Sequence, residues 1–166
     1  MTAQYRYVAE LGTSRSKIDT DALIDLLTIH RVHRSIIAQM DRYLAKWKLN
    51  TTWFWLLINV VSRRDDPPSP AELAEECGIA RPTMTSALNV LQRRGLLRRE
   101  EDAKDHRMFR IRLTDAGEAF MKEVFPQLCE ALLSTNKYLS GKDRAALLRL
   151  FQKAQRGVAD FFGETS

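Results

Sequence analysis

The sequence has few cysteines and histidines and no long apolar run, and each shortage excludes a class of protein. Two cysteines, Cys77 and Cys129, are too few for a disulfide framework and indicate buried apolar residues in a reducing cytosol. With three histidines and no Cys-x-x-Cys pair, Gly-rich phosphate loop or Ser-centred elbow, no enzyme is predicted. The longest apolar runs, such as residues 53–58, are far shorter than the roughly 20 residues that cross a membrane. The chain does not open on a basic cluster followed by an apolar stretch, so we expect no secretory signal.

The rest of the composition is that of one globular domain with an uneven charge. Hydrophobic residues make up 45% and charged residues 28% of the 166 residues, which excludes disorder throughout. The net charge is only +5, but residues 78–114 carry nine basic and four acidic residues, whereas residues 115–166 are neutral overall. This concentration indicates a polyanionic partner, with a solvated charged face as the alternative.

Helical periodicity dominates the amino-terminal part of the chain. Residues 20–47 carry apolar side chains at helical spacing without proline or glycine, which predicts one long helix capped by Asp19 or the residue after it. The apolar stripe is too wide for one buried face, so we expect this helix to pack on two neighbours. Thr51 and Thr52 offer a cap for a second helix, over residues 53–63.

Two further helices are predicted at the carboxyl-terminal end. Asp115 is expected to cap a long helix that contains Pro126, which should kink the helix or mark a joint. Ser140 begins the last helix, whose apolar side ends with residues 158–162. That side would expose a large apolar area in a lone subunit, which favours a two-fold partner over packing within one monomer.

The middle of the chain has strong helix boundaries. Residues 65–70 contain three prolines and cannot continue the preceding helix. Ser69 is expected to cap a short helix that closes at Gly78. A second helix over residues 81–94 follows and ends at Gly95. The pattern is that of a helix-turn-helix.

A strand pair follows the second helix. Residues 96–100 and 108–113 read as two strands around a polar tip, and apolar and basic residues alternate over residues 109–113 of the second strand. Together with the preceding helices this predicts a mainly α fold with a small two-stranded antiparallel wing, a winged helix-turn-helix.

The second helix of the motif carries short polar side chains opposite its apolar side. A major groove about 12 Å wide accepts one helix, and outward side chains then meet base edges. A core helix with an ordinary polar face is the alternative. We expect base contacts from Arg81, Pro82, Thr83, Thr85, Ser86 and Asn89. We expect contacts with the DNA backbone from Arg93, Arg94, Arg98, Arg99 and Arg110.

Three stretches of the sequence carry a family resemblance. Residues 73–96, the Asp-His-Arg run at 105–107 and the Leu-Thr-Asp-Ala-Gly run at 113–117 resemble the MarR family of bacterial and archaeal transcriptional regulators. The resemblance covers almost the whole chain. It implies a cytoplasmic, ligand-responsive repressor that binds a pseudo-palindromic operator as an intertwined homodimer.

The resemblance also implies a division of labour along the chain. It assigns residues 1–50 to an N-terminal dimerisation helix, residues 51–114 to the DNA-binding module and residues 115–166 to C-terminal dimerisation helices. In the wing, Arg107 resembles the family's minor-groove arginine, Asp105 resembles the partner that orients it, and His106 lies between them.

Two residues of the recognition region depart from the family pattern. Ala80 stands where the family often has Ser or Thr, so the helix lacks its usual side-chain cap. Asn89 stands where the family commonly has Asp. Both departures bear on which operator sequence is read.

A ligand site is the least defined expectation. No cofactor or metal is predicted, but family members commonly bind small aromatic or phenolic anions. Trp53 and Trp55 supply an aromatic wall, and His30 and His33 supply titratable rings, for such an effector. Core packing of these residues, a metal on the two histidines and a redox role for either cysteine remain alternatives.

Three functions compete on these observations. The leading hypothesis is a sequence-specific DNA-binding regulator. A winged-helix module that binds proteins and not DNA is the second, and an enzyme is the least supported.

Overall fold

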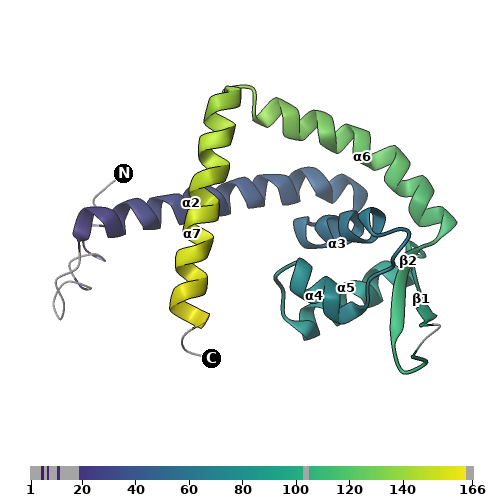
Figure 1. The fold of residues 1–166 in the computed structure, drawn as a ribbon. Coiled ribbons are helices and arrows are strands. Elements are labelled where there is room, and N and C mark those ends of the chain that lie inside the picture. Colours follow the sequence, from purple (N-terminus) through teal and green to yellow (C-terminus); the bar gives the residue numbers. More distant parts are fainter. Residues whose placement is uncertain (1–4, 6, 8–10, 12–18, 103–104, 164–166) are drawn as a thin grey trace. The chain divides into compact units, whose positions relative to one another are not determined.

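The computed structural model describes residues 5, 7 and 11 and the ranges 19–102 and 105–163, without the side chain of Phe162. The chain divides into two compact units, Met1–Glu118 and Ala119–Ser166. Helices and one two-stranded sheet make up the described residues, which confirms the predicted fold class (Figure 1). Within this part of the chain, no helix is both long and apolar enough to cross a membrane.

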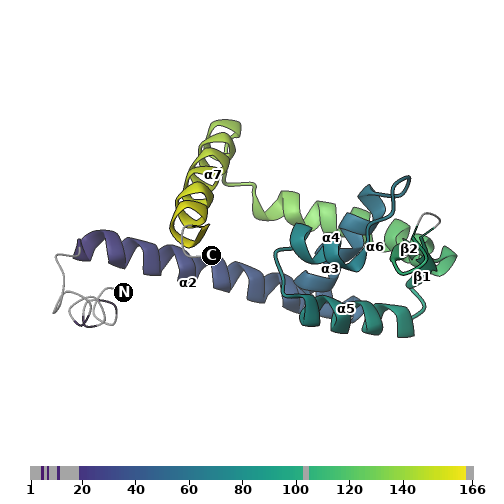
Figure 2. The same ribbon diagram turned by 60° about the horizontal axis from the view of Figure 1, so that its bottom comes forward.

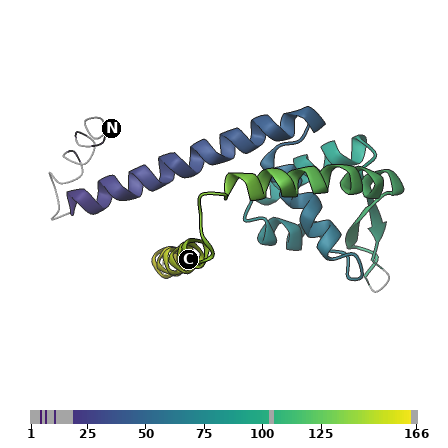
Figure 3. The same ribbon diagram turned by 90° about the horizontal axis from the view of Figure 1, so that it is seen from above.

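Helix α2, Thr20–Leu44, begins where the sequence predicts and ends one turn earlier. Asp19 caps it, because its Oδ1 atom accepts hydrogen bonds from two first-turn amides at 3.1 Å each. The predicted last turn is a separate 3₁₀ helix, η1, Ala45–Trp47, which ends at Lys48 in the left-handed conformation with φ of 54°. Most of α2 extends away from the other helices of the first unit (Figure 3).

Helix α3, Thr51–Ser62, is capped by Asn50, so the prediction of a cap at Thr51 or Thr52 is wrong. The Oδ1 atom of Asn50 accepts a hydrogen bond from a first-turn amide at 2.8 Å. Thr51 is instead the first helical residue, and its amide donates to the Asp41 carboxylate of α2 at 2.6 Å. This contact ties the start of α3 to the end of α2.

Helices α4, Pro70–Glu76, and α5, Arg81–Arg93, form the predicted helix-turn-helix. Ser69 caps α4 in a reciprocal capping box: its Oγ accepts from the Glu72 amide at 3.2 Å, and Glu72 Oε2 accepts from the Ser69 amide at 2.6 Å. The turn between the helices passes through Gly78, whose φ of 63° suits glycine.

The wing consists of β1, Leu97–Glu101, and β2, Phe109–Leu113, paired antiparallel in register over all five residues of each strand. Each strand begins one residue later than predicted. Leu96 is not part of β1 because its amide closes the end of α5 with a 3.0 Å bond to a helix carbonyl. The outer side of β2 is tied to the segment before α4, where the Ile111 amide donates to the Pro68 carbonyl at 2.9 Å.

A closed apolar core holds the helix-turn-helix and the wing together. Its members come from α3, α4, α5 and β2, so the module buries side chains from elements that are distant in sequence. The largest of its fully buried side chains include Phe54, Leu57, Leu73, Leu88, Leu91 and Ile111.

Helix α6, Asp115–Thr135, starts in close contact with the wing. A Cβ atom at Gly117 would lie 2.1 Å from the carbonyl oxygen of Leu96, so this approach requires glycine. The predicted cap at Asp115 is wrong by one residue. The Thr114 hydroxyl accepts from the Gly117 amide at 3.0 Å, and Asp115 is the first helical residue.

The second unit contains most of α6 and helix α7, Gly141–Gly163. Pro126 lies inside α6 without ending it, so no joint occurs there. Ser140 caps α7 as predicted: its amide donates to Asp143 at 2.8 Å, and its Oγ accepts from the Asp143 amide at 3.3 Å. Among the α7 side chains that the structure describes, all are exposed except the half-buried Ala146.

Candidate nucleic-acid interface

The side chains of α5 divide into a buried and an exposed side, as the amphipathic spacing predicts. The buried side consists of Met84, Ala87, Leu88 and Leu91. All six residues for which we expect base contacts are exposed, namely Arg81, Pro82, Thr83, Thr85, Ser86 and Asn89. The helix lies at the edge of the module next to the wing (Figure 2). This geometry leaves the polar side of α5 accessible to a partner with a groove that accepts a helix.

The first turn of α5 has the unusual start that the sequence indicates. Ala80 occupies the cap position and contributes no side-chain hydrogen bond. Further along, the Thr85 hydroxyl donates to the Arg81 carbonyl at 3.0 Å. Because its proton is used in this bond, the exposed Thr85 oxygen presents acceptor lone pairs to the outside.

Two arginines of β1 differ in the side chains with which they pair. Arg99 reaches α5, where its Nη2 atom donates to Asn89 Oδ1 at 2.8 Å. This contact brings together one predicted base-contacting residue and one predicted phosphate-contacting residue. Arg98 is exposed and pairs within its own strand, with Nε 2.8 Å from Glu100 Oε1.

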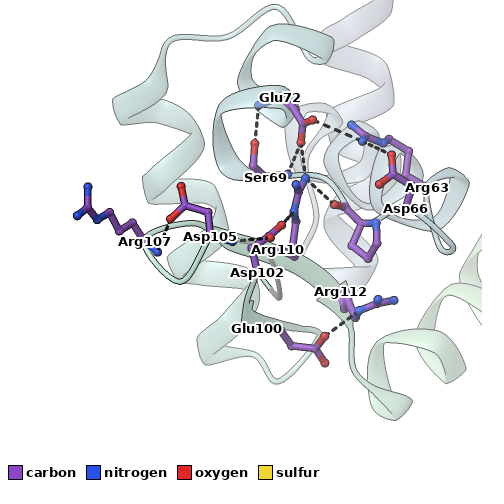
Figure 4. Close-up of polar contacts among 11 residues, drawn as sticks. Arg63, Asp66, Ser69, Glu72, Glu100, Asp102, Asp105, Arg107, Arg110 and Arg112 are labelled. Carbon is purple, nitrogen blue, oxygen red and sulfur yellow. Dashed lines mark hydrogen bonds and ion pairs between the residues drawn. The ribbon is translucent and has the colours of Figure 1, made fainter.

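The wing tip presents Arg107, and Asp105 contacts the backbone amide of Arg107. Asp105 Oδ1 accepts a hydrogen bond from the backbone amide of Arg107 at 3.0 Å. The guanidinium of Arg107 points away from this carboxylate into solvent (Figure 4). Asp105 therefore shapes the backbone of the turn. His106 is exposed beside them, with Nδ1 3.7 Å from Glu101 Oε2.

Arg110 faces the protein, whereas the sequence predicts a contact with the DNA backbone. Its Nε donates to Asp102, and its Nη1 donates to Glu72 Oε2 at 3.1 Å and to the Pro67 carbonyl at 3.2 Å. The hydrogen bond to Asp102 raises the pKa of Arg110 above its ordinary value. The Nε and Nη1 donors of this guanidinium are therefore engaged by the protein, and its contact with the DNA backbone stays a prediction.

Arg94 also has internal partners where a phosphate contact is predicted. Its Nη1 donates to the Lys48 carbonyl at 2.7 Å, and its Nη2 donates to the Trp47 carbonyl at 2.9 Å. Burial lowers the pKa of Arg94, although a guanidinium keeps its charge. Arg94 thus links the end of α5 to the end of η1, whereas its neighbour Arg93 is exposed.

Several residues of this region carry interactions that the sequence reasoning did not assign. Glu72 and Asp102 hold Arg110, Arg63 pairs with Asp66 and Glu76, and Arg112 pairs with Glu100. The Ser-x-x-Glu spacing of a capping box was a signal for Glu72. Arg63 and Asp66 are three residues apart, whereas the remaining pairs join residues from separate elements, so local sequence carries no signal for those.

The four residues predicted to line an effector pocket come from two helices. His30 and His33 are exposed on α2, about 16 Å or more before its end by the 1.5 Å rise per residue. Trp53 is half-buried and Trp55 is 46% exposed, both in the first half of α3. The pocket remains a prediction.

The cysteines offer little support for a redox switch. Cys77 is half-buried, and desolvation raises the pKa of its thiol, partly offset by the Asn59 amide 3.5 Å from its sulfur. A raised pKa lowers the fraction of reactive thiolate at neutral pH. Cys129 is also half-buried.

The sequence of this chain is similar to known proteins over most of their length. A family model described as the MarR family matches residues 47–108. The transcriptional repressor MprA of Escherichia coli strain K12 is 31% identical over 146 residues, which cover 83% of this chain and 82% of that protein.

Two solved structures share the fold. A mutant of E. coli MarR complexed with operator DNA has a TM-score of 0.72 at 21% identity, covering 84% of this chain and 99% of that one. Bordetella bronchiseptica BpsR, whose DNA binding is regulated by 6-hydroxynicotinic acid, has a TM-score of 0.68 at 23% identity, covering 77% and 90%. Members of the family that the sequence match identifies are transcription factors and not enzymes. With its winged helix-turn-helix and its identity to MprA, the chain belongs to the MarR family of transcriptional regulators.

Proposed function

We propose that this regulator is a repressor that binds duplex DNA as a homodimer, with α5 in a major groove and Arg107 in the adjacent minor groove. The observation that carries the proposal is the exposed polar side of α5, joined to the wing by the bond between Arg99 and Asn89. A major groove accepts one such helix, and an exposed arginine at a wing tip suits the negative potential of a narrow minor groove.

The contacts within the proposed complex follow from which side chains are exposed. Base edges would meet Arg81, Pro82, Thr83, Thr85, Ser86 and Asn89. Arg93, Arg98 and Arg99 are exposed and can reach phosphates, and His106 flanks Arg107 at the tip. Arg94 and Arg110 are assigned to contacts within the protein.

The proposed homodimer rests on the apolar side chains that the described helices leave exposed. In α7, Leu148, Phe151 and Phe161 are between 51% and 68% exposed, and in α2, Leu26 and Ile29 exceed 50%. Monomeric proteins rarely expose apolar patches of this kind, and a second copy related by a two-fold axis covers both. A two-fold dimer reads two half-sites, so the operator is expected to be pseudo-palindromic.

A small aromatic acid is the proposed effector class. The regulation of BpsR by 6-hydroxynicotinic acid supports this class for a protein of the same fold. The candidate residues are His30, His33, Trp53 and Trp55. Such a ligand would shift the population between binding-competent and incompetent forms, and it would weaken DNA binding to the same degree that DNA weakens its own binding.

A binding selection on random duplexes tests the proposal, followed by gel shifts of the selected site with the full chain. We expect Arg107→Ala to weaken binding about 5-fold to 150-fold, which corresponds to about 1–3 kcal/mol. Binding should also weaken steeply as salt rises. A chain that selects no duplex at low salt would instead favour the alternative, a winged-helix module that binds proteins. Repetition with a panel of aromatic acids tests the effector.

The proposed place of action is the cytoplasm, where bacterial and archaeal chromosomes lie.

A further inference from the structure

A series of hydrogen-bonded residues runs from α4 to the tip of the wing. It consists of Glu72, Arg110, Asp102, Asp105 and Arg107, in that order (Figure 4). Each member contacts the next through a hydrogen bond, and the backbone amides of Asp105 and Arg107 are the donors of the last two bonds. The series therefore connects the helix-turn-helix to the residue proposed to enter the minor groove.

The α4 end of this series is fixed independently of the wing. The Glu72 carboxylate accepts from the Ser69 amide at 2.6 Å, and this bond is the main reason why the pKa of Glu72 is lowered. Arg63 of the α3–α4 connection adds a second positive charge, 3.6 Å from Glu72 Oε1. The acceptor that receives Arg110 is thus an ionised group with its own partners in the α3–α4 segment.

Asp102 is the central member because both of its carboxylate oxygens are used. The residue is only 8% exposed. Its Oδ2 accepts from Arg110 Nε, and its Oδ1 accepts from the Asp105 amide at 3.1 Å. A buried carboxylate without a counterion is costly, so Arg110 is what permits Asp102 to sit at this point of the hairpin.

Backbone hydrogen bonds add to the Asp102 carboxylate in holding residues 105–108. The Met108 carbonyl accepts from the Asp102 amide at 3.0 Å, and the Met108 amide donates to the Asp105 carbonyl at 2.8 Å. Asp105 Oδ1 then receives the amide of Arg107. The direction in which the Arg107 side chain leaves the backbone is therefore set by bonds that begin at Asp102.

We propose that Arg110 and Asp102 are positioning residues that lock the wing tip to α4 and so aim Arg107. Neither side chain touches DNA in this arrangement. The proposal rests on the proposed DNA-binding function, because its purpose is the direction of Arg107. It replaces the expectation that Arg110 contacts a phosphate.

The protein provides a matched control for Arg110 on the same strand. Arg112 lies two residues from Arg110 on β2 and also has internal partners, since its Nε donates to Glu100 Oε2 at 2.8 Å and its Nη1 donates to the Arg64 carbonyl at 3.0 Å. These partners do not belong to the series of hydrogen-bonded residues that reaches the tip. Arg112→Met removes the same charge from the same strand and leaves Asp102 and Arg110 in place.

The first measurement needs no DNA. Hydrogen exchange in the full chain should be at least tenfold faster at the Asp105 and Arg107 amides in Arg110→Met than in the wild type, with less than a twofold change in Arg112→Met. Asp102→Ala should give the same pattern if Arg110→Met does not fold. Equal exchange rates at these two amides in the wild type, in Arg110→Met and in Asp102→Ala would overturn the proposal.

The second measurement is a double-mutant cycle on a selected duplex. In the wild-type background, Arg107→Ala should weaken binding at least fivefold, whereas in Arg110→Met it should add less than a twofold loss, because the arginine is no longer aimed. A merely destabilising change at Arg110 would leave the two losses multiplicative, and that outcome overturns the proposal. If the wild type binds no duplex, the proposed function fails, while the exchange measurement still decides whether the tip is locked.

Discussion

The winged module and α7 differ in how far their apolar side chains are buried. In the module, Leu88, Leu91 and Ile111 are no more than 2% exposed. In α7, Leu148, Phe151 and Phe161 are each more than half exposed, although α7 is as amphipathic in sequence as α5 is. The module therefore completes its core within one chain, whereas α7 leaves its apolar side exposed, and the proposed dimer would cover that side.

The arginines show a related contrast inside the module. Arg93, Arg98 and Arg107 are exposed, whereas Arg94 and Arg110 donate to carbonyls and carboxylates of neighbouring elements. Charge alone does not distinguish the two groups. The exposed arginines are available to bind a polyanion, and the arginines with internal partners stabilise the module that carries the exposed ones.

The largest expected effect comes from placing charge on the apolar side of α7. Leu147 and Phe151 lie one turn apart, so Leu147→Asp with Phe151→Asp should dissociate the proposed dimer. Burial of each such side chain contributes about 1.5–3 kcal/mol, and a two-fold interface contains each twice. We expect the dimer dissociation constant to rise on the order of ten-thousand-fold in analytical ultracentrifugation.

Arg156→Asp is the control for this change. By helix geometry its side chain lies on the opposite side of α7 from Leu147, and it is exposed. The control should leave the association unchanged. A double variant that sediments like the wild type would mean that α7 does not form the interface.

A smaller effect is expected when the module core is opened. Leu91 has no exposed surface, so Leu91→Ala should lower the free energy of unfolding by about 2–5 kcal/mol. Urea denaturation at several protein concentrations measures it and sharpens the comparison. The difference caused by Leu91→Ala should stay constant with concentration, whereas that caused by the α7 variant should grow with it.

The adjacent pair Arg93 and Arg94 gives the next effect in size. Arg94→Met leaves the Trp47 and Lys48 carbonyls without their donor and should cost about 1–3 kcal/mol of stability, with the salt dependence of DNA binding unchanged. Arg93→Met should keep stability and reduce the slope of log affinity against log salt by about 0.9. If Arg94→Met changed the salt dependence and Arg93→Met lowered the stability, Arg94 would be the phosphate contact and Arg93 the structural residue.

Local sequence predicted the elements well because their boundaries depend on neighbouring residues. Ser69, Gly78 and Asp19 mark helix ends through bonds within a few residues. The cap at Asn50 was missed because its neighbour Thr51 is an equally good cap by composition, and only the contact with Asp41 of α2 makes Thr51 helical.

Of the candidate interface, the sequence predicts the exposed residues of α5 and does not predict the internal contacts of its arginines. Amphipathic spacing indicates which α5 residues face outward, and the structure places them there. Arg94 donates to Lys48, 46 residues away in sequence, and Arg110 donates to Glu72, 38 residues away, as well as to Asp102 across the hairpin. No periodicity reports such a contact, so both arginines were assigned by charge to the DNA.

The smallest expected effect is a pH dependence at Glu72, the α4 end of the hydrogen-bonded series that reaches Arg107. The Ser69 amide lowers the pKa of Glu72 below its ordinary value of 4.5, so the folded state binds the proton less readily than the unfolded chain does. The resulting stabilisation is complete above that ordinary value and is lost as the pH falls through the lowered pKa. Glu72→Gln should therefore lower the free energy of unfolding at pH 7 and have less effect at pH 3, as measured by urea denaturation. Glu75→Gln, an exposed neutralisation on the same helix, is the control. If Glu72→Gln were equally destabilising at both pH values, the charge of Glu72 would not contribute, and the capping geometry alone would hold α4.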